Sequence, residues 1–279
     1  MNEFFESTDT GGTPMKESGR RNFLKSAAAL GAAIPAGAAA QSKPAPHADH
    51  EKQHAQHMRA ATAAAQQRPY MFLSQTEAAF LDAAVSHLIP KDELGPGAKE
   101  AGVTSFIDQQ LFGGYGTMAK KYTQGPWPEG TPQQGYQSPL TPAAVYRAGI
   151  RDTNNYCRKT YAKSFDALSR AQQDEVLKGL DEGKIELEQV RAQFFFNMLL
   201  ANTVEGFFAD PVYGGNRDKA GWKLVGFPGV AAVYTTFIEK HGVPYRAQPV
   251  SIADITQKIA QVDEHGHAVH VMLDDKAGV

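Results

Sequence analysis

The chain has 279 residues, of which 42% are hydrophobic and 21% are charged, enough apolar material for the buried core of one or two domains. The formal net charge is −2, so we expect no nucleic-acid partner and no strong attraction to anionic surfaces. A single cysteine excludes an internal disulfide, a CxxCH haem site and a four-cysteine zinc or iron–sulfur site.

Residues 1–40 have the layout of an export signal. Gly19–Lys25 read GRRNFLK, an Ala-rich apolar run covers 26–34, and small residues continue to position 40. A basic segment, a short apolar segment and a small-residue cleavage region are typical of a signal peptide. The segment resembles a twin-arginine signal, with Gly19 in place of the usual Ser or Thr. The signal residues are Arg20, Arg21, Phe23, Leu24 and Lys25. We therefore expect export by the twin-arginine translocase to the periplasm, with the signal either cleaved or kept as an anchor.

Residues 41–69 are rich in Ala, Gln and His and have almost no large apolar side chains. Such a segment cannot bury enough surface to offset the entropy of ordering, so a disordered linker is expected. Its histidines have helical spacing, which is one way to bind a metal, but no carboxylate or cysteine framework accompanies them. A solvated tail is the simpler interpretation, and we extend it to three histidines near the C-terminus. The histidines concerned are His47, His50, His54, His57, His265, His267 and His270.

Residues 70–249 are expected to form one mainly α-helical domain with long loops rich in Gly, Pro and aromatics, followed by a C-terminal tail at 250–279. Two capping boxes, Ser74 with Glu77 and Ser169 with Gln172, predict helix starts. Thr141 before a proline predicts a third start. No long segment alternates with period two, so strands are not predicted.

Apolar side chains recur at helical spacing behind these starts. The periodic sets are Phe80, Leu81, Ala84, Val85 and Leu88; Tyr146, Ile150, Thr153, Cys157 and Tyr161; and Leu187, Val190, Phe194, Met198 and Ala201. Phe195 and Phe196 widen the apolar face formed by the last set. Gly206 is expected to end that helix. A shorter helix is expected at Val103–Phe112. The Gly/Pro/aromatic loop 113–142 is a candidate binding element.

Familiar catalytic signatures are missing. The sequence has no GxSxG, HExxH or Walker-type loop, and Gly113–Gly116 does not complete a dinucleotide-binding GxGxxG. His87 and His241 have no evident nucleophile or metal partner, so both are interpreted as structural. Cys157 falls on a helical face and is interpreted as a small core residue.

One stretch combines charges, turns and aromatics. Residues 205–229 read EGFFADPVYGGNRDKAGWKLVGFPG, and we call them the signature segment. Asp210-Pro211 and Gly214-Gly215-Asn216 are turn sequences. The carboxylates could act as acid–base groups or metal ligands, the aromatics and Arg217 could anchor an interface, or the segment could be a rigid loop. Spacing alone leaves these three possibilities open.

The signature segment resembles that of the gluconate 2-dehydrogenase subunit 3 family, the small subunit of membrane-associated gluconate 2-dehydrogenase. The resemblance extends over about 70–255 and includes FLSQTEAAFLDAAVSHLIP and PVSIADI. It implies a heterotrimer with a large GMC-type flavoprotein carrying FAD and a multihaem cytochrome c carrying haem c. The small subunit itself is implied to hold no cofactor or metal, to be non-catalytic, and to help the large subunit fold and be exported.

The resemblance supplies no catalytic residues. From the residue types we expect a partner interface, or residues that order the loop facing the partner, at Phe207, Phe208, Tyr213, Arg217 and Trp222. Arg217 is expected to pair with Asp210, Asp218 or a carboxylate of the partner. Two other functions stay open: a self-contained metal-dependent periplasmic enzyme, and a periplasmic sugar-binding protein that uses the loop 113–142. Which sugar, sugar acid or polyol the complex oxidises is not specified by the sequence.

Overall fold

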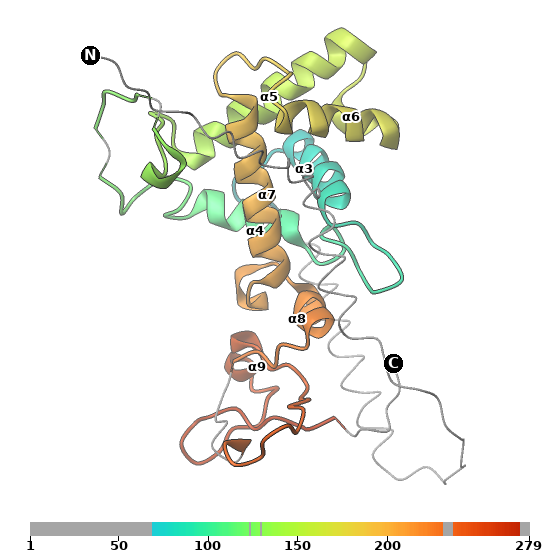
Figure 1. Cartoon of the computed structure of the whole chain (residues 1–279), viewed down its shortest axis with the longest axis vertical. Helices are drawn as coiled ribbons and strands as arrows, with labels where there is room; N and C mark the ends of the chain where they lie inside the picture. Colours follow the sequence, from blue (N-terminus) through green and yellow to red (C-terminus); the bar gives the residue numbers. More distant parts are fainter. Residues whose placement is uncertain (1–68, 123, 129, 231–236, 274–279) are drawn as a thin grey trace, which may run out of the picture. The chain divides into compact units, whose positions relative to one another are not determined.

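The computed structural model describes residues 69–122, 124–128, 130–230 and 237–273 (Figure 1). The predicted signal residues Arg20, Arg21, Phe23, Leu24 and Lys25 lie outside the described residues, as do the four histidines of the predicted linker. The signal, the linker and their boundaries therefore remain predictions.

The described residues are mainly α-helical, and their only β pairings are isolated bridges, which confirms the predicted class. The α-helices are α3 (Gln75–Leu88), α4 (Val103–Phe112), α5 (Pro142–Tyr161), α6 (Arg170–Asp181), α7 (Ala192–Phe208), α8 (Ala220–Val225) and α9 (Ile252–Thr256). The 3-10 helices are η1 (Pro132–Gln134), η2 (Phe165–Ala167), η3 (Pro211–Tyr213) and η4 (Arg217–Lys219). None of the helices in this part of the chain is long and apolar enough to cross a membrane.

The three predicted helix starts are present. The Ser74 side chain accepts from the backbone N–H of Glu77, and the Glu77 carboxylate accepts from the backbone N–H of Ser74 at 2.8 Å. Ser169 and Gln172 form the same reciprocal pair at α6, and Thr141 caps α5. These contacts pair backbone N–H groups that a helix start leaves without an internal partner.

Helix α7 differs from its prediction at both ends. Residues 187–191 are not helical, because the buried Asp152 carboxylate accepts from the backbone N–H groups of Glu188 and Gln189, each at 3.1 Å. The predicted face starting at Leu187 is therefore wrong. The buried side chains of the helix are Ala192, Phe195, Phe196, Leu199, Asn202, Thr203 and Phe207.

Gly206 lies inside α7 rather than at its end, so the predicted stop is also wrong. A Cβ at this position would lie 2.7 Å from Cδ1 of Phe106 on α4. Glycine is therefore required for the close approach of α4 to α7 and not for a helix end. The helix continues for one more half-turn, to Phe208.

Helix α7 is the centre of the packing, because it contacts α3, α4, α5, α6 and α8. The core against it is aromatic: the ring of Phe80 lies 4.6 Å from that of Phe165, and Tyr146 packs edge-on against Phe195 at 5.8 Å. Cys157 is fully buried, and this burial raises the pKa of its thiol to about 11. Cys157 is thus a core residue, as predicted, with little thiolate character.

His87 is also structural, as predicted. Its side chain is buried, Nδ1 lies 3.0 Å from Oδ1 of Asp174, and Nε2 lies 2.8 Å from Oε1 of Gln173. Gln173 in turn donates to the backbone carbonyls of Phe165 and Asp166. The imidazole therefore ties α3 to α6 and η2.

Candidate functional site: the signature segment and its pocket

The signature segment folds back and caps the C-terminus of α7. The indole Nε1 of Trp222 donates to the carbonyl of Phe208 at 2.7 Å, and the Asn216 amide donates to the carbonyl of Ala209 at 2.8 Å. Asn216 is fully buried in a left-handed conformation, and its Oδ1 accepts from the N–H of Gly221. Side chains thereby replace water as partners of the carbonyls at the end of the helix.

Asp210 begins a turn, as its sequence predicts, and also holds a distant segment. Its Oδ1 accepts from the N–H of Val212, and its Oδ2 accepts from the N–H of Ile252, at 2.9 and 2.8 Å. The backbone of Val250 pairs with Pro228 and Val230. Residues 250–256, predicted above as part of the C-terminal tail, therefore pack on the signature segment.

An ion pair also holds the same segment. Lys219 Nζ lies 2.6 Å from Oδ2 of Asp254, and the two side chains are only 14% and 8% exposed. Burial alone would raise the pKa of Asp254. The hydrogen bond from Lys219, the bonds from Ser251 and the charge of Lys219 outweigh it, so the pKa lies below its ordinary value.

Arg217 connects the signature segment to the link between α3 and α4. Its backbone N–H donates to the carbonyl of Ala101 at 2.9 Å, and its guanidinium reaches the carbonyl of Glu100 at 3.4 Å. Burial lowers the pKa of the guanidinium, while the negative charges of Asp218 and Asp82 act in the opposite direction. Both carboxylate oxygens of Asp210, one of the expected partners, accept from backbone N–H groups.

The five residues expected at a partner interface lie in different environments. Phe207 and Trp222 are buried, at 2% and 5% exposure, whereas Tyr213 is 51% exposed. Phe208 packs edge-on against Phe207, and Trp222 packs edge-on against the exposed Phe227. Phe207, Phe208 and Trp222 therefore order the segment, and Tyr213 is the aromatic side chain of the five that it presents to solvent.

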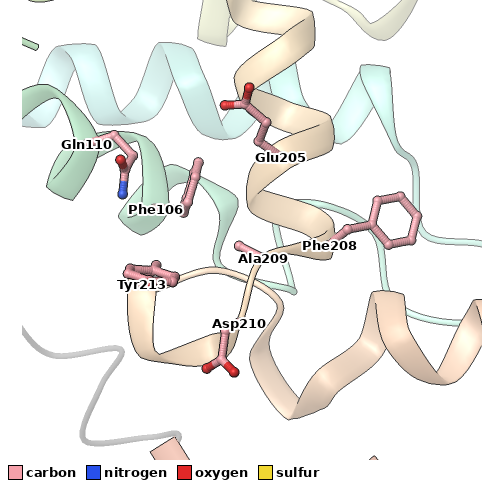
Figure 2. Close-up of a pocket in the computed structure, with 7 residues that line it drawn as sticks. All are labelled: Phe106, Gln110, Glu205, Phe208, Ala209, Asp210 and Tyr213. Atoms are coloured by element: carbon pink, nitrogen blue, oxygen red, sulfur yellow. The ribbon is translucent and has the colours of Figure 1, made fainter. Parts of the chain in front are cut away.

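A surface pocket of about 400 Å³ lies between α4, the end of α7 and η3. Figure 2 shows Phe106 and Gln110 on α4, Glu205 on α7 and Tyr213 on the turn below, whereas the carboxylate of Asp210, which also lines the pocket, points away from them. Ala209 and Phe208 complete the lining, with the Phe208 ring on the side of α7 away from Phe106 (Figure 2). Sequence reasoning missed Phe106 and Gln110, since their helix precedes the signature segment by about a hundred residues and carries no matching motif.

Glu205 is positioned at this pocket by a polar network in the core. The hydroxyls of Tyr146 and Tyr115 donate to Oδ1 of Asn202, at 2.9 and 3.2 Å, and Nδ2 of Asn202 donates to Glu205 at 2.9 Å. Burial, followed by the charges of neighbouring groups, raises the pKa of Tyr146 well above its ordinary value. Tyr146 is thus a neutral hydroxyl donor, and the network orients the carboxylate.

Metal-binding chemistry has no visible framework in the part of the chain that the structure describes. Within those residues no group of three or more His, Cys, Asp or Glu side chains is placed to hold a metal ion. His265 and His267 lie near the Asp263 and Glu264 carboxylates on an exposed turn, and His270 bonds to the carbonyl of Val230 instead.

Comparison with known protein families identifies the chain's relatives. The family model described as gluconate 2-dehydrogenase subunit 3 matches residues 75–229, more than half of the chain, from the start of α3 to the end of the signature segment. Searches of curated proteins and of solved structures found no significant match. Helices α3 to α8, the capped end of α7 and the residues that line the pocket therefore all lie within the matched region, whereas α9 follows it. The chain belongs to the gluconate 2-dehydrogenase subunit 3 family.

Proposed function

We propose that the chain is the non-catalytic small subunit of a periplasmic, membrane-associated flavin-dependent dehydrogenase that oxidises gluconate, a sugar or a polyol. In this proposal it assists the folding of the large FAD-containing subunit and takes it through the twin-arginine translocase. A multihaem cytochrome c is the third member and receives the electrons. FAD and haem c belong to those partners, and this chain binds neither.

The observation that carries the proposal is the family match over residues 75–229, because the family is that of a dehydrogenase subunit. Two features agree with a binding role. The signature segment is held rigidly by buried hydrogen bonds, and next to these bonds it presents exposed apolar side chains. Those side chains are Val212, Tyr213, Leu224, Val225 and Phe227. Exposed apolar groups on a rigid frame are typical of protein interfaces.

The export role is tested by co-expressing this chain with the large subunit and measuring periplasmic flavoprotein. Replacing both Arg20 and Arg21 with Lys keeps the charge but removes the paired guanidinium groups. We expect flavoprotein to accumulate in the cytoplasm. The matched control replaces Arg158 and Lys159, adjacent exposed basic residues at the end of α5, and export should then be unchanged. A large subunit that still reaches the periplasm with the double Lys variant would contradict the carrier role.

A further inference from the structure

The pocket beside Glu205 holds negative charge that the described chain does not neutralise. Among the described residues, the carboxylate of Glu205 accepts a hydrogen bond only from Asn202, and both oxygens of Asp210 accept from backbone N–H groups. Neither carboxylate forms an ion pair with a Lys, Arg or His among the described residues. An uncompensated carboxylate at an apolar pocket favours a cationic ligand.

The walls of the pocket suit the same chemistry. The rings of Phe106 and Tyr213 and the methyl group of Ala209 line it, and the carboxylate of Glu205 lies at its edge (Figure 2). A guanidinium or ammonium group is attracted to the face of an aromatic ring, and its methylene stem packs on apolar surface. A volume of about 400 Å³ accommodates a single long side chain together with a few waters.

Glu205 is prepared for such a ligand before it arrives. An exposed glutamate normally loses side-chain entropy when it forms an ion pair. Here Asn202 holds one oxygen of the carboxylate, and the hydroxyls of Tyr115 and Tyr146 fix the orientation of Asn202. The Glu205 side chain is therefore already partly ordered in the free chain, so less side-chain entropy is lost when a ligand binds, and the affinity for that ligand is higher.

We propose that this pocket binds one basic side chain, Arg or Lys, of the large flavoprotein subunit. The inference rests on the proposed function, because that function supplies the partner. The positive group pairs with Glu205, while the stem of the side chain packs along Phe106 and Tyr213. Since the pocket lies next to the rigid signature segment, this single contact also sets the register in which the two subunits dock.

The test measures the dissociation constant between the purified large subunit and variants of this chain, at low and at high salt. Glu205→Gln removes the charge and keeps an oxygen for Asn202, so the fold is retained, which circular dichroism and the melting temperature verify. We expect at least tenfold weaker binding and a smaller salt dependence. Tyr213→Ala should weaken binding by a similar factor. The control is Glu186→Gln, an exposed glutamate between α6 and α7, which should bind as the original chain does.

The possible outcomes separate the proposal that the pocket binds a basic side chain from the proposal that the chain is a dehydrogenase subunit. If the large subunit binds the original chain and binds both pocket variants within twofold, the pocket proposal is wrong and the subunit role stands. A Glu186→Gln loss equal to that of Glu205→Gln would also overturn the pocket proposal, because only net charge would then matter. If the large subunit does not bind the original chain, both proposals fail.

Discussion

Lys219 and Asp254 form a nearly buried ion pair, with Nζ and Oδ2 2.6 Å apart, that joins the signature segment to residues 250–256. The carboxylate also caps α9 by accepting from the N–H of Ser251. One side chain thus serves two structural purposes, and its removal affects both. Because the segment it holds lies beside η3, which lines the pocket, this pair bears on the candidate site.

Replacing Asp254 with Asn should loosen residues 250–256 without unfolding the helices around α7. Loss of a charge-assisted hydrogen bond costs about 1.5–3 kcal/mol. We expect this loss to weaken the docking of residues 250–256 on the signature segment. Hydrogen exchange at the amide of Ile252, which donates to Asp210, should become faster by one to two orders of magnitude. Unchanged protection of Ile252 would show that the ion pair does not hold the segment.

The same carboxylate gives a predicted pH dependence. The pKa of Asp254 in the folded chain lies below the value of 3.8 for a free side chain. Its contribution to docking is therefore complete above about pH 4 and is lost as the pH falls through the lower folded value. Protection of Ile252 should decrease below about pH 4 in the original chain and change less in Asp254→Asn. Parallel pH profiles for the two chains would contradict this assignment.

Trp222→Phe should destabilise the domain by about 1–3 kcal/mol, since it leaves the carbonyl of Phe208 without the indole N–H that caps α7. Chemical denaturation measures this change. The matched control is Trp127→Phe, in the loop between α4 and α5, for which we expect a change within about 0.5 kcal/mol. Equal effects at the two positions would argue against a capping role for Trp222.

Gly215→Ala tests how closely the signature segment packs on the backbone of α7. A Cβ at residue 215 would lie 2.2 Å from the backbone carbonyl oxygen of Gly206, and no side-chain rotation relieves that contact. We expect a loss of about 1–3 kcal/mol, seen as a lower melting temperature. At Gly114 the nearest atom to an added Cβ is 3.8 Å away, so Gly114→Ala serves as the control. A Gly215→Ala chain as stable as the original would mean that the segment does not pack as described.

His87→Leu should also destabilise the chain, by about 1–3 kcal/mol, because Gln173 and Asp174 lose their partner between α3 and α6. The imidazole carries no predicted catalytic role, so binding of the large subunit should persist once the variant is folded. Denaturation and subunit capture are measured on the same preparation. Loss of capture at full stability would assign His87 a functional role that its contacts do not indicate.

Much of the helical framework could be predicted from local sequence. Capping boxes and helical spacing depend on residues three or four apart, and for this reason the starts of α3, α5 and α6 agree with their predictions. The start of α7 could not be predicted in this way, because Asp152 of α5 holds residues 188 and 189 in a loop. A long-range contact of this kind leaves no periodic signal along the chain.

The candidate site shows the same division. The turn at Asp210 was predictable, since aspartate before proline caps its own turn. The position of Gly206 inside α7 was not, because it depends on the ring of Phe106 from another helix. The signature segment drew attention to Tyr213, but the pocket exists only where α4 meets η3. The packing of α4 against η3 cannot be predicted from composition or from the spacing of residues along the chain.

We propose that this chain works as a subunit of a flavoprotein complex, and purification with its partner tests this proposal most directly. An affinity tag at the C-terminus of this chain is used to purify it from cells that also make the large subunit, and the flavin absorbance and the mass of the product are recorded. We predict a complex with one large subunit and one FAD per tagged chain, and no flavin on the tagged chain made alone. A tagged chain that binds its own flavin, or that is recovered without the large subunit, would contradict it.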